Sequence, residues 1–462
     1  MVASHQGPNF AALNWYVMLV YKYGGTSVGS VQNMNHVKEI IQGGGQKLVV
    51  LSAMSGTTNA LVKLSQTIAD GDRESAIIQL HQLNESYQTT VYELLHDQPL
   101  RQETSAYVNA IFQTLTDAVA VPHSQLLHNT IVAQGELLST YMFSRFLQQE
   151  GHSVVLLPAL EFMRIDRMNE PDNFYIQQNL RRLIAQQPKA DFYITQGFIC
   201  LDAEGKIANL QRGGSDYTAT IIGAAINAQE VQIWTDIDGF HNNDPRHVHH
   251  TQSLSHLSFD EAAELAYFGA KILHPQTVLP LRNLNIPLKL KNTMDPEAVG
   301  TTINNEIHGE GIKAIAAKDG ITAIKIKSVR MLLAHGFLKK VFEVFETYET
   351  AIDMITTSEI AVSLTIDDTS RLNEIIEALE KFATVEVDDY MSIVCMVGNN
   401  IIHHPDTPAL FQVLQDVNVR MIAYGGSNNN ISVLVNTSDK KETLQKLQRY
   451  AFEASSVNAG LA

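Results

Sequence analysis

Hydrophobic residues in the first half of the chain form short unbroken runs, and small polar residues follow several of them. Tyr16–Tyr21 is apolar, aromatic or β-branched throughout, and Lys47–Leu51 and Val231–Thr235 have the same character. Such a continuous run predicts a strand that is buried on both faces, as in a parallel sheet. Further strands are expected at Ser153–Leu157, Asp191–Ile199 and Asn283–Leu290.

Between these runs, apolar positions recur at helical spacing. The pattern predicts a helix over Val31–Gln42, a helical segment over residues 60–150, and a helix over Phe259–Leu273 that His274-Pro275 ends. Within the long segment, Gly135 is expected to interrupt the helix. Strands that alternate with helices predict an α/β domain, in which helices cover both faces of a mostly parallel sheet.

From about residue 300 the pattern changes to shorter strands and helices, and it repeats itself. At one constant spacing, Phe342, Ser358 and Ser363 recur as Phe411, Ser427 and Ser432. A unit of strand, helix, strand, strand, helix and strand has the ferredoxin-like order. The repetition therefore predicts two copies of one small α+β unit.

The composition narrows the class of protein. The chain has 462 residues, 45% of them hydrophobic, and a formal net charge of −16. These values exclude a largely disordered chain and argue against a surface for nucleic acid or an anionic membrane. Cys200 and Cys395 lie in apolar runs, which indicates buried thiols in a reducing compartment. No run of about 20 apolar residues occurs, so no membrane span is expected. Residues 1–14 lack the basic residues of a signal peptide and are interpreted as a loose leader, so a cytoplasmic protein is expected.

The first candidate site is the segment KYGGTSVGS, which begins at Lys22. Lys22 lies at the carboxyl end of a predicted strand, where open α/β sheets bind ligands. Gly24 and Gly25 allow the backbone to approach an anion closely, and Ser27 adds a hydroxyl group. Amides at a helix start together with one lysine predict a phosphate cradle. Read alone, the segment also fits an ordinary glycine-rich turn with a solvated lysine.

Three further segments carry chemistry. Arg212 offers a planar fork for a carboxylate, Ser215 is expected to cap a helix, and Asp216 can hold a metal-bound phosphate or orient a nucleophile. A strand that ends in Thr235-Asp236 suits a nucleotide pocket, with Arg246 near phosphate. Lys271, in a helix end, can bind a ligand or merely complement the helix dipole. Each segment taken alone is also explained by a capped turn or an ordinary helix end.

Six motifs taken together are more specific than any one of them. KYGGTSVGS, LSAMSGTTN, GELLST, QRGGSDYTA, WTDIDGFHNNDPR and FGAKILHP, in this order, resemble the aspartate kinases of the amino-acid-kinase fold. The tandem units that follow resemble ACT domains. The resemblance covers nearly the whole chain from about Val17. It implies a catalytic α/β domain over residues 15–300, a second ACT domain from residues 310–320 and 391–462, and a first ACT domain, residues 321–390, inserted within it.

The resemblance also implies a role for each matching residue. Lys22 contacts the transferred phosphoryl group, and Asp216 organises the reacting groups. The implied ATP-binding residues are Lys22, Gly24, Gly25, Ser27, Thr235, Asp236, His241, Arg246 and Lys271. The implied aspartate-binding residues are Ser52, Thr58, Glu136, Arg212 and Ser215. Among the aspartate-binding residues, Glu136 receives the α-ammonium group and Arg212 the α-carboxylate. Among the ATP-binding residues, His241 stands where related sequences often have tyrosine.

The implied reaction transfers the γ-phosphoryl group of ATP to the β-carboxylate of L-aspartate. The product is 4-phospho-L-aspartate, in the first step of lysine, threonine and methionine biosynthesis. The substrate carboxylate is itself the nucleophile, so positioning and charge stabilisation suffice. Mg²⁺ is expected to bind mainly through ATP and water, with no metal site formed by the protein alone. Two alternatives are an acyl-phosphate kinase acting on glutamate or a related acid, and an ACT amino-acid sensor without catalytic activity.

The first repeat resembles the effector site of lysine-sensitive aspartate kinases. The matching residues are Met331, Gly336, Phe337, Leu338, Asp353, Thr357, Ser358 and Glu359. Asp353 and Glu359 can pair with the ammonium groups of L-lysine, or they are simply solvated acids at strand ends. The second repeat has Ile422 and Asn428 at those places, which predicts one effector site per chain. Because ACT domains usually pair across chains, a homodimer or a larger tetramer is expected.

Overall fold

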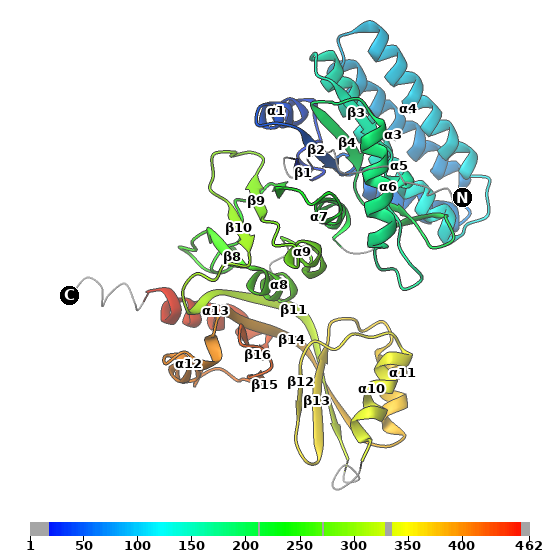
Figure 1. Ribbon diagram of the computed structural model, residues 1–462. Helices are drawn as coiled ribbons and strands as arrows, with labels where there is room; N and C mark the ends of the chain where they lie inside the picture. The colour runs from blue at the N-terminus through cyan, green and yellow to red at the C-terminus, as the bar shows by residue number, and fades with distance from the viewer. Residues whose placement is uncertain (1–17, 211–212, 270–271, 329–334, 454–462) are drawn as a thin grey trace, which may run out of the picture. The chain divides into compact units, whose positions relative to one another are not determined.

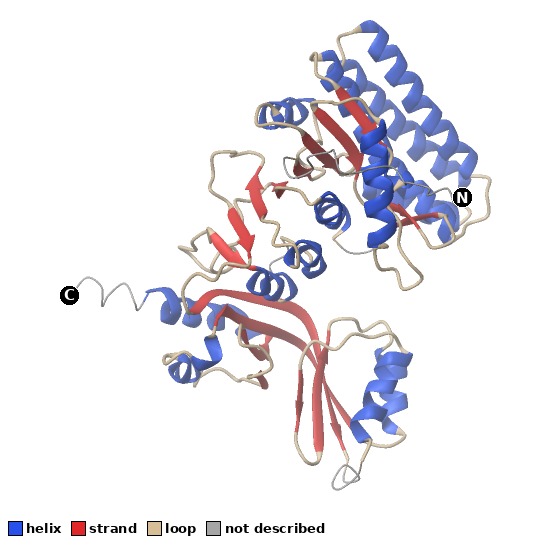
Figure 2. Ribbon diagram, viewed as in Figure 1, coloured by secondary structure: helices blue, strands red, loops and turns tan. Residues whose placement is uncertain are grey.

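The computed structural model describes residues 18–210, 213–269, 272–328 and 335–453. The chain divides into two compact units (Figures 1 and 2). The first extends to Gly239 and includes Gln276–Asn305, and the second comprises Phe240–Pro275 and the chain from Glu306 onward. None of the helices in the described residues combines the length and the apolar character that a membrane span requires.

The first unit contains a mostly parallel sheet, as predicted. Its strands are β1 (Leu19–Tyr23), β2 (Lys47–Leu51), β3 (Val154–Leu157), β4 (Phe192–Gln196), β7 (Glu230–Thr235), β9 (Leu288–Asn292) and β10 (Thr301–Asn304). They lie in the order β3-β4-β2-β1-β7-β9-β10. Every pair in this order is parallel except β9 with β10. The central strand β1 is therefore flanked by β2 on one side and by β7 on the other, which makes it the point where the strand order reverses.

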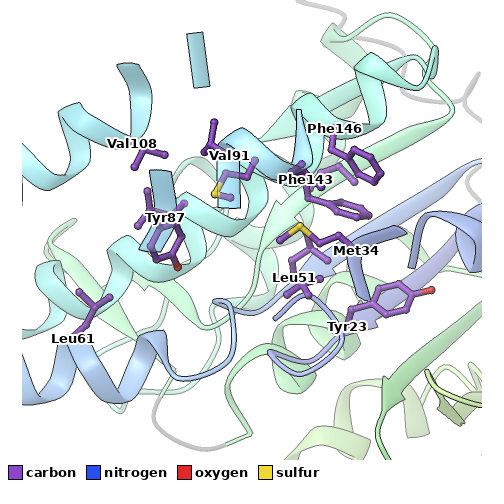
Figure 3. Close-up of a cluster of buried hydrophobic side chains, with 14 of the residues drawn as sticks. Tyr23, Met34, Leu51, Leu61, Tyr87, Val91, Val108, Phe143 and Phe146 are labelled. Atoms are coloured by element: carbon purple, nitrogen blue, oxygen red, sulfur yellow. The ribbon is translucent and has the colours of Figure 1, made fainter. Parts of the chain in front are cut away.

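Helices surround this sheet (Figure 2). They are α1 (Val31–Ile41), α2 (Thr57–Ala69), α3 (Arg73–Leu94), α4 (Gln98–Ala118), α5 (Gln125–Gln149), α6 (Asn173–Gln186), α7 (Gly214–Ile226) and α9 (Pro275–Arg282). A short hairpin, β5 (Ile199–Leu201) and β6 (Ile207–Asn209), follows β4. Side chains of β1, β2 and α1–α5 form one buried cluster, in which Tyr23, Met34 and Phe143 are fully covered (Figure 3). Helices α2–α5 confirm the helical segment predicted over residues 60–150.

Two strand predictions have the wrong bounds. The strand predicted to reach Ile199 stops at Gln196, since Phe198 has a φ of 67° and turns the chain. The strand expected from Asn283 begins only at Leu288, because Asn285 is in the left-handed region with a φ of 50°. It is followed by β10, which pairs with it in the antiparallel direction.

Two helix predictions are also wrong. Gly135 does not interrupt α5, which runs through it from Gln125 to Gln149. The helix predicted over Phe259–Leu273 ends at Tyr267, because Gly269 has a φ of 125°. Pro275 begins α9 instead of ending a helix, which is the position where proline loses no hydrogen bond.

The second unit is built on one antiparallel sheet. Its strands are β11 (Gly311–Lys327), β12 (Ile355–Thr357), β13 (Ala361–Ile366), β14 (Thr384–Asn399), β15 (Met421–Ala423) and β16 (Asn430–Asn436), in the order β12-β13-β11-β14-β16-β15. The long strands β11 and β14 run through both halves (Figure 1). Their pairing shifts between Lys318 and Ile321, so a bulge marks the middle of the sheet.

Each half of this sheet has its own helices and its own core. One core includes α10 (Phe337–Thr347) and α11 (Leu372–Glu380), and the other includes α12 (Thr407–Val413) and α13 (Lys440–Gln448). The predicted repeat is therefore present as two α+β halves that share β11 and β14. A short strand, β8 (His256–Ser258), and α8 (Phe259–Tyr267) also belong to this unit. Cys200 and Cys395 are buried free thiols, as predicted.

Candidate active site

The loops that follow five parallel strands start along one line at the carboxyl edge of the sheet. This follows from the register, which places Tyr23 beside both Leu51 and Trp234. Backbone hydrogen bonds continue beyond the strands, from Ser52 N to Tyr23 O at 3.2 Å and from Gly197 N to Leu51 O at 2.9 Å. On the other side of β1, Thr293 N donates to Thr235 O at 2.7 Å. Parallel pairing therefore gathers segments that are far apart in the sequence.

Lys22 and Asp216, the two predicted catalytic residues, form an ion pair at this edge. Lys22 Nζ lies 2.6 Å from Asp216 Oδ1, with 10% of the lysine side chain and 18% of the aspartate side chain exposed. Asp216 belongs to the first turn of α7, where the helix dipole favours a negative charge. The ammonium group is thus held near the surface, where it can exchange part of this contact for an incoming phosphate.

The glycine-rich loop is held tightly against the loop after β2. A Cβ atom on Gly25 would lie 2.8 Å from Ala53 O, so no other residue fits there without a shift. Ser55 N donates to Gly25 O at 3.1 Å. The buried hydroxyls of Ser27 and Thr293 are hydrogen-bonded at 2.8 Å. These contacts preorganise the loop that the sequence predicts to hold phosphate.

Ser52 and Ser215, two of the predicted substrate-binding residues, are in contact. Ser52 Oγ donates to Ser215 Oγ at 2.9 Å. Ser215 lies in the first turn of α7 and does not cap it, because Gly213 occupies the N-cap with a φ of 69°. A Cβ atom on Gly197 would stand 2.3 Å from Ser215 Cβ. Gly197 therefore lets the start of α7 reach the end of β4.

Glu136 is a buried carboxylate with one unused oxygen. It lies in the middle of α5 and is 2% exposed. Its Oε1 accepts a hydrogen bond from Ala53 N at 3.1 Å, whereas Oε2 has no hydrogen-bond partner among the described residues. Burial raises the pKa of Glu136 to about 7. A desolvated carboxylate with a free acceptor is a site for a cationic group.

A close approach of two backbones positions Glu136. A Cβ atom on Gly135 would lie 2.8 Å from Ala53 Cβ, so glycine lets α5 approach the loop after β2. Sequence reasoning missed this role of Gly135, and it also missed Gly197 and Thr293. The roles of Gly135 and Gly197 could have been suspected, because glycine within a helix or at a strand end often marks close packing. Nothing in the local sequence distinguishes Thr293.

The other predicted site residues make only local contacts or lie outside the described residues. Thr58 lies in the first turn of α2. Thr235 ends β7, and its hydroxyl donates to Asp236 Oδ1 at 3.1 Å. In the second unit, His241 Nδ1 is 3.1 Å from Thr251 Oγ1, and the exposed guanidinium of Arg246 pairs with Asp244 at 2.7 Å. Arg212, Lys271 and Met331 lie outside the described residues.

The predicted effector residues of the second unit lie at the ends of α10 and β12. Gly336 is the N-cap of α10 with a φ of 84°, followed by buried Phe337 and by Leu338, which is 38% exposed. Asp353 precedes β12 and its side chain is 2% exposed. Thr357 ends β12, and Ser358 and Glu359 are exposed in the turn that leads to β13.

Comparison with known proteins identifies the family. Residues 17–292 match the amino acid kinase family, and residues 394–450 match an ACT domain. Lysine-sensitive aspartokinase 3 of Escherichia coli (strain K12) is 34% identical over 451 residues, which cover 94% of this chain and 99% of that protein.

Two solved structures extend this comparison. E. coli aspartokinase III in complex with aspartate and ADP (R-state) is 33% identical, covers 94% of this chain and 100% of that chain, and has a TM-score of 0.83. The complex of that enzyme with lysine and aspartate (T-state) is 32% identical, covers 94% and 99%, and has a TM-score of 0.77. The chain therefore belongs to the aspartokinase family.

Proposed function

We propose that this chain transfers the γ-phosphoryl group of ATP to the β-carboxylate of L-aspartate and forms 4-phospho-L-aspartate. This reaction places it at the start of the biosynthesis of lysine, threonine and methionine. The observation that carries the proposal is the buried, half-satisfied carboxylate of Glu136 at the same sheet edge as Lys22 and Asp216. This arrangement of charges suits an α-amino acid whose side chain reaches a phosphate cradle. The complex of the E. coli relative with aspartate and ADP supports the choice of substrates.

Separate residues bind the amino acid and stabilise the transferred phosphoryl group. Glu136 holds the α-ammonium group, Arg212 holds the α-carboxylate, and Ser52 and Ser215 close the pocket around the amino acid. Lys22 stabilises the negative charge that develops on the transferred phosphoryl group. The ionised side-chain carboxylate of the substrate attacks directly, so no residue has to act as a general base.

The nucleotide is proposed to lie along the carboxyl edge of β1 and β7. Backbone amides of Gly24 and Gly25, with the Ser27 hydroxyl, bind its phosphates. The other proposed contacts are Thr235, Asp236, His241, Arg246 and Lys271. The described residues contain no cluster of three or more His, Cys, Asp or Glu side chains that could hold a metal. Mg²⁺ would bind mainly through ATP and water and would neutralise phosphate charge, and Asp216, which lies beside Lys22, would be the carboxylate of the chain that helps to hold it.

Trapping the product tests this function directly. Hydroxylamine converts an acyl phosphate into a hydroxamate, so the enzyme is incubated with ATP, Mg²⁺ and either L-aspartate or L-glutamate. We expect hydroxamate with L-aspartate and little with L-glutamate. Faster reaction with L-glutamate would assign the chain to a different acyl-phosphate kinase, and no hydroxamate with either acid would refute the proposal.

We further propose that the ACT half of the chain binds L-lysine as a feedback inhibitor. Asp353 and Glu359 pair with its ammonium groups, and the remaining contacts come from Met331, Gly336, Phe337, Leu338, Thr357 and Ser358. Inhibition is then a coupling free energy between this site and the kinase site. The name of the E. coli relative and its structure with lysine support this effector.

Calorimetric titration with L-lysine tests the effector site. Glu359→Gln is expected to raise the dissociation constant by about tenfold, because the glutamine oxygen still accepts a hydrogen bond but no longer carries the charge that strengthens it toward an ammonium group. Glu377→Gln is a matched control, since Glu377 is also an exposed acid in the same half of the unit. Absence of lysine binding by the wild type, or equal effects of the two substitutions, would contradict the assignment.

The domain bounds and the assembly are part of the same proposal. The catalytic domain comprises residues 15–300, the first ACT domain residues 321–390, and the second ACT domain residues 310–320 and 391–462. We propose a cytoplasmic homodimer that forms through the ACT domains, or a tetramer of two such dimers. Light scattering coupled to size-exclusion chromatography measures the mass, and a monomer at micromolar concentration would refute the dimer.

A further inference from the structure

Asp353 already has two partners from its own chain. Its Oδ1 accepts a hydrogen bond from the Tyr267 hydroxyl at 2.7 Å and lies 2.8 Å from Lys318 Nζ. The other oxygen, Oδ2, is buried and has no hydrogen-bond partner among the described residues. One oxygen of this carboxylate therefore has two partners and the other has none among the described residues, with 2% of the side chain exposed.

Lys318 is placed by several independent contacts. Its Nζ also lies 2.8 Å from Asp367 Oδ2, and it stands 4.6 Å from the centre of the Tyr267 ring. Lys318 is the last residue of β11 before the bulge that divides the sheet of the second unit. Hydrogen bonds to Asp353 and Asp367 outweigh partial burial and raise the pKa of Lys318. The ammonium group is therefore a fixed positive charge beside Asp353.

We infer that Lys318 is an internal competitor of the cationic effector at Asp353, and that it sets the effector concentration to which the chain responds. This inference rests on the proposed role of Asp353 in binding L-lysine. The effector ammonium takes the free Oδ2, while Lys318 keeps Oδ1 and opposes the second positive charge. Tyr267, a neutral donor, orients the carboxylate without adding charge.

The size of the effect follows from the distances. Because the two oxygens of a carboxylate are neighbours, an ammonium bound at Oδ2 stands roughly 5 Å from Lys318 Nζ. Repulsion between two positive charges at that range weakens binding by roughly 4-fold at the dielectric constant of water and by roughly 200-fold at the effective value of about 20 near a protein surface. Because Asp367 neutralises part of the Lys318 charge, we expect an effect of roughly tenfold. Asp367 draws part of the Lys318 charge away from Asp353, so it moderates this competition.

The test measures aspartate phosphorylation by the full chain at increasing L-lysine concentration, together with calorimetric titration. Lys318→Met keeps the length of the side chain and removes its charge, and we expect half-inhibition at roughly tenfold lower L-lysine. Lys446→Met is the matched control, since both lysine side chains are 20% exposed and Lys446 pairs with Asp416 and Glu442 instead. Unchanged or weaker inhibition in Lys318→Met would overturn the inference.

A second pair of variants tests the opposite direction and avoids leaving Asp353 unpaired. Asp367→Asn removes the second carboxylate that pairs with Lys318, so the full positive charge of Lys318 acts at Asp353. Inhibition should therefore require several-fold more L-lysine. Asp368→Asn changes the net charge equally at the neighbouring exposed residue and should have no effect. Equal effects of the two substitutions would overturn the inference. Activity without L-lysine tests the proposed kinase, and inhibition of the wild type tests the proposed effector, so the ratios between variants and wild type test Lys318 alone.

Discussion

Replacing Glu136 by glutamine tests the buried charge on which the substrate assignment depends. Glutamine has the same shape and keeps an oxygen that can accept the hydrogen bond from Ala53 N, so the geometry should persist. The negative charge at the free Oε2 position is lost. Truncating a buried charge pair in this way costs about 2–5 kcal/mol of binding. The KM for L-aspartate should therefore rise by roughly 30-fold to a few thousand-fold.

The pH dependence of kcat/KM for L-aspartate is a second, independent test of this role of Glu136. Burial raises the pKa of Glu136 from 4.5 to about 7, so at pH 6 only a minority of the carboxyl groups carry the charge that binds an ammonium. In the wild type, kcat/KM for L-aspartate should fall about tenfold per pH unit below this pKa and level off above it. Glu136→Gln cannot titrate, so its kcat/KM should lack this slope.

The same shift predicts an effect on folding stability. Between pH 4.5 and about 7 the folded chain holds a proton at Glu136 that the unfolded chain has released. The stability present below pH 4.5 is therefore lost as the pH rises, by about 3 kcal/mol in all. Relative to wild type, Glu136→Gln should gain in melting temperature as the pH rises from 5 to 8, and scanning calorimetry measures this difference.

Glu230→Gln is the matched control for these measurements. Glu230 belongs to the same sheet, but it lies at the amino end of β7, where it pairs with Lys289 at 2.7 Å. It should leave the KM for L-aspartate unchanged. A KM in Glu136→Gln within threefold of wild type, or a wild-type kcat/KM that is flat between pH 6 and 8, would refute the assignment of Glu136 to the substrate ammonium.

Two further substitutions test the cradle and the packing behind it. Lys22→Met should lower kcat by about 10³-fold or more with little change in melting temperature, because the charge acts on the transition state. Lys289→Met is its control. An unchanged rate in Lys22→Met would exclude the role of Lys22. Gly197→Ala places a Cβ 2.3 Å from that of Ser215, so it should raise the KM for L-aspartate and lower the melting temperature by several degrees. Gly426→Ala, whose Cβ meets nothing within 4 Å, should change neither quantity, and an equal response would show that Gly197 is not a close-packing position.

The local elements of the chain could be predicted where a single pattern dominated. Lys47–Leu51 is a strand with the predicted bounds, and the helix expected to end at Gln42 ends one residue earlier. Burial on both faces leaves a strand no polar position, so the apolar run itself records the parallel sheet. The bounds failed where one residue adopted a positive φ, as at Phe198 and Asn285, because a pattern over many residues does not reveal a single left-handed one.

The sequence by itself determined the two kinds of fold, the repeat and the residue types at the cradle, because each is recorded in consecutive residues. Only the tertiary structure decided which distant groups meet. Lys22 reaches Asp216 because parallel strands end together, and Glu136 accepts a hydrogen bond from Ala53 N because Gly135 lets α5 approach the loop after β2. The pairing of Asp353 with Lys318 has no local signature either. Such contacts depend on register and close packing between separate elements, which no stretch of neighbouring residues encodes.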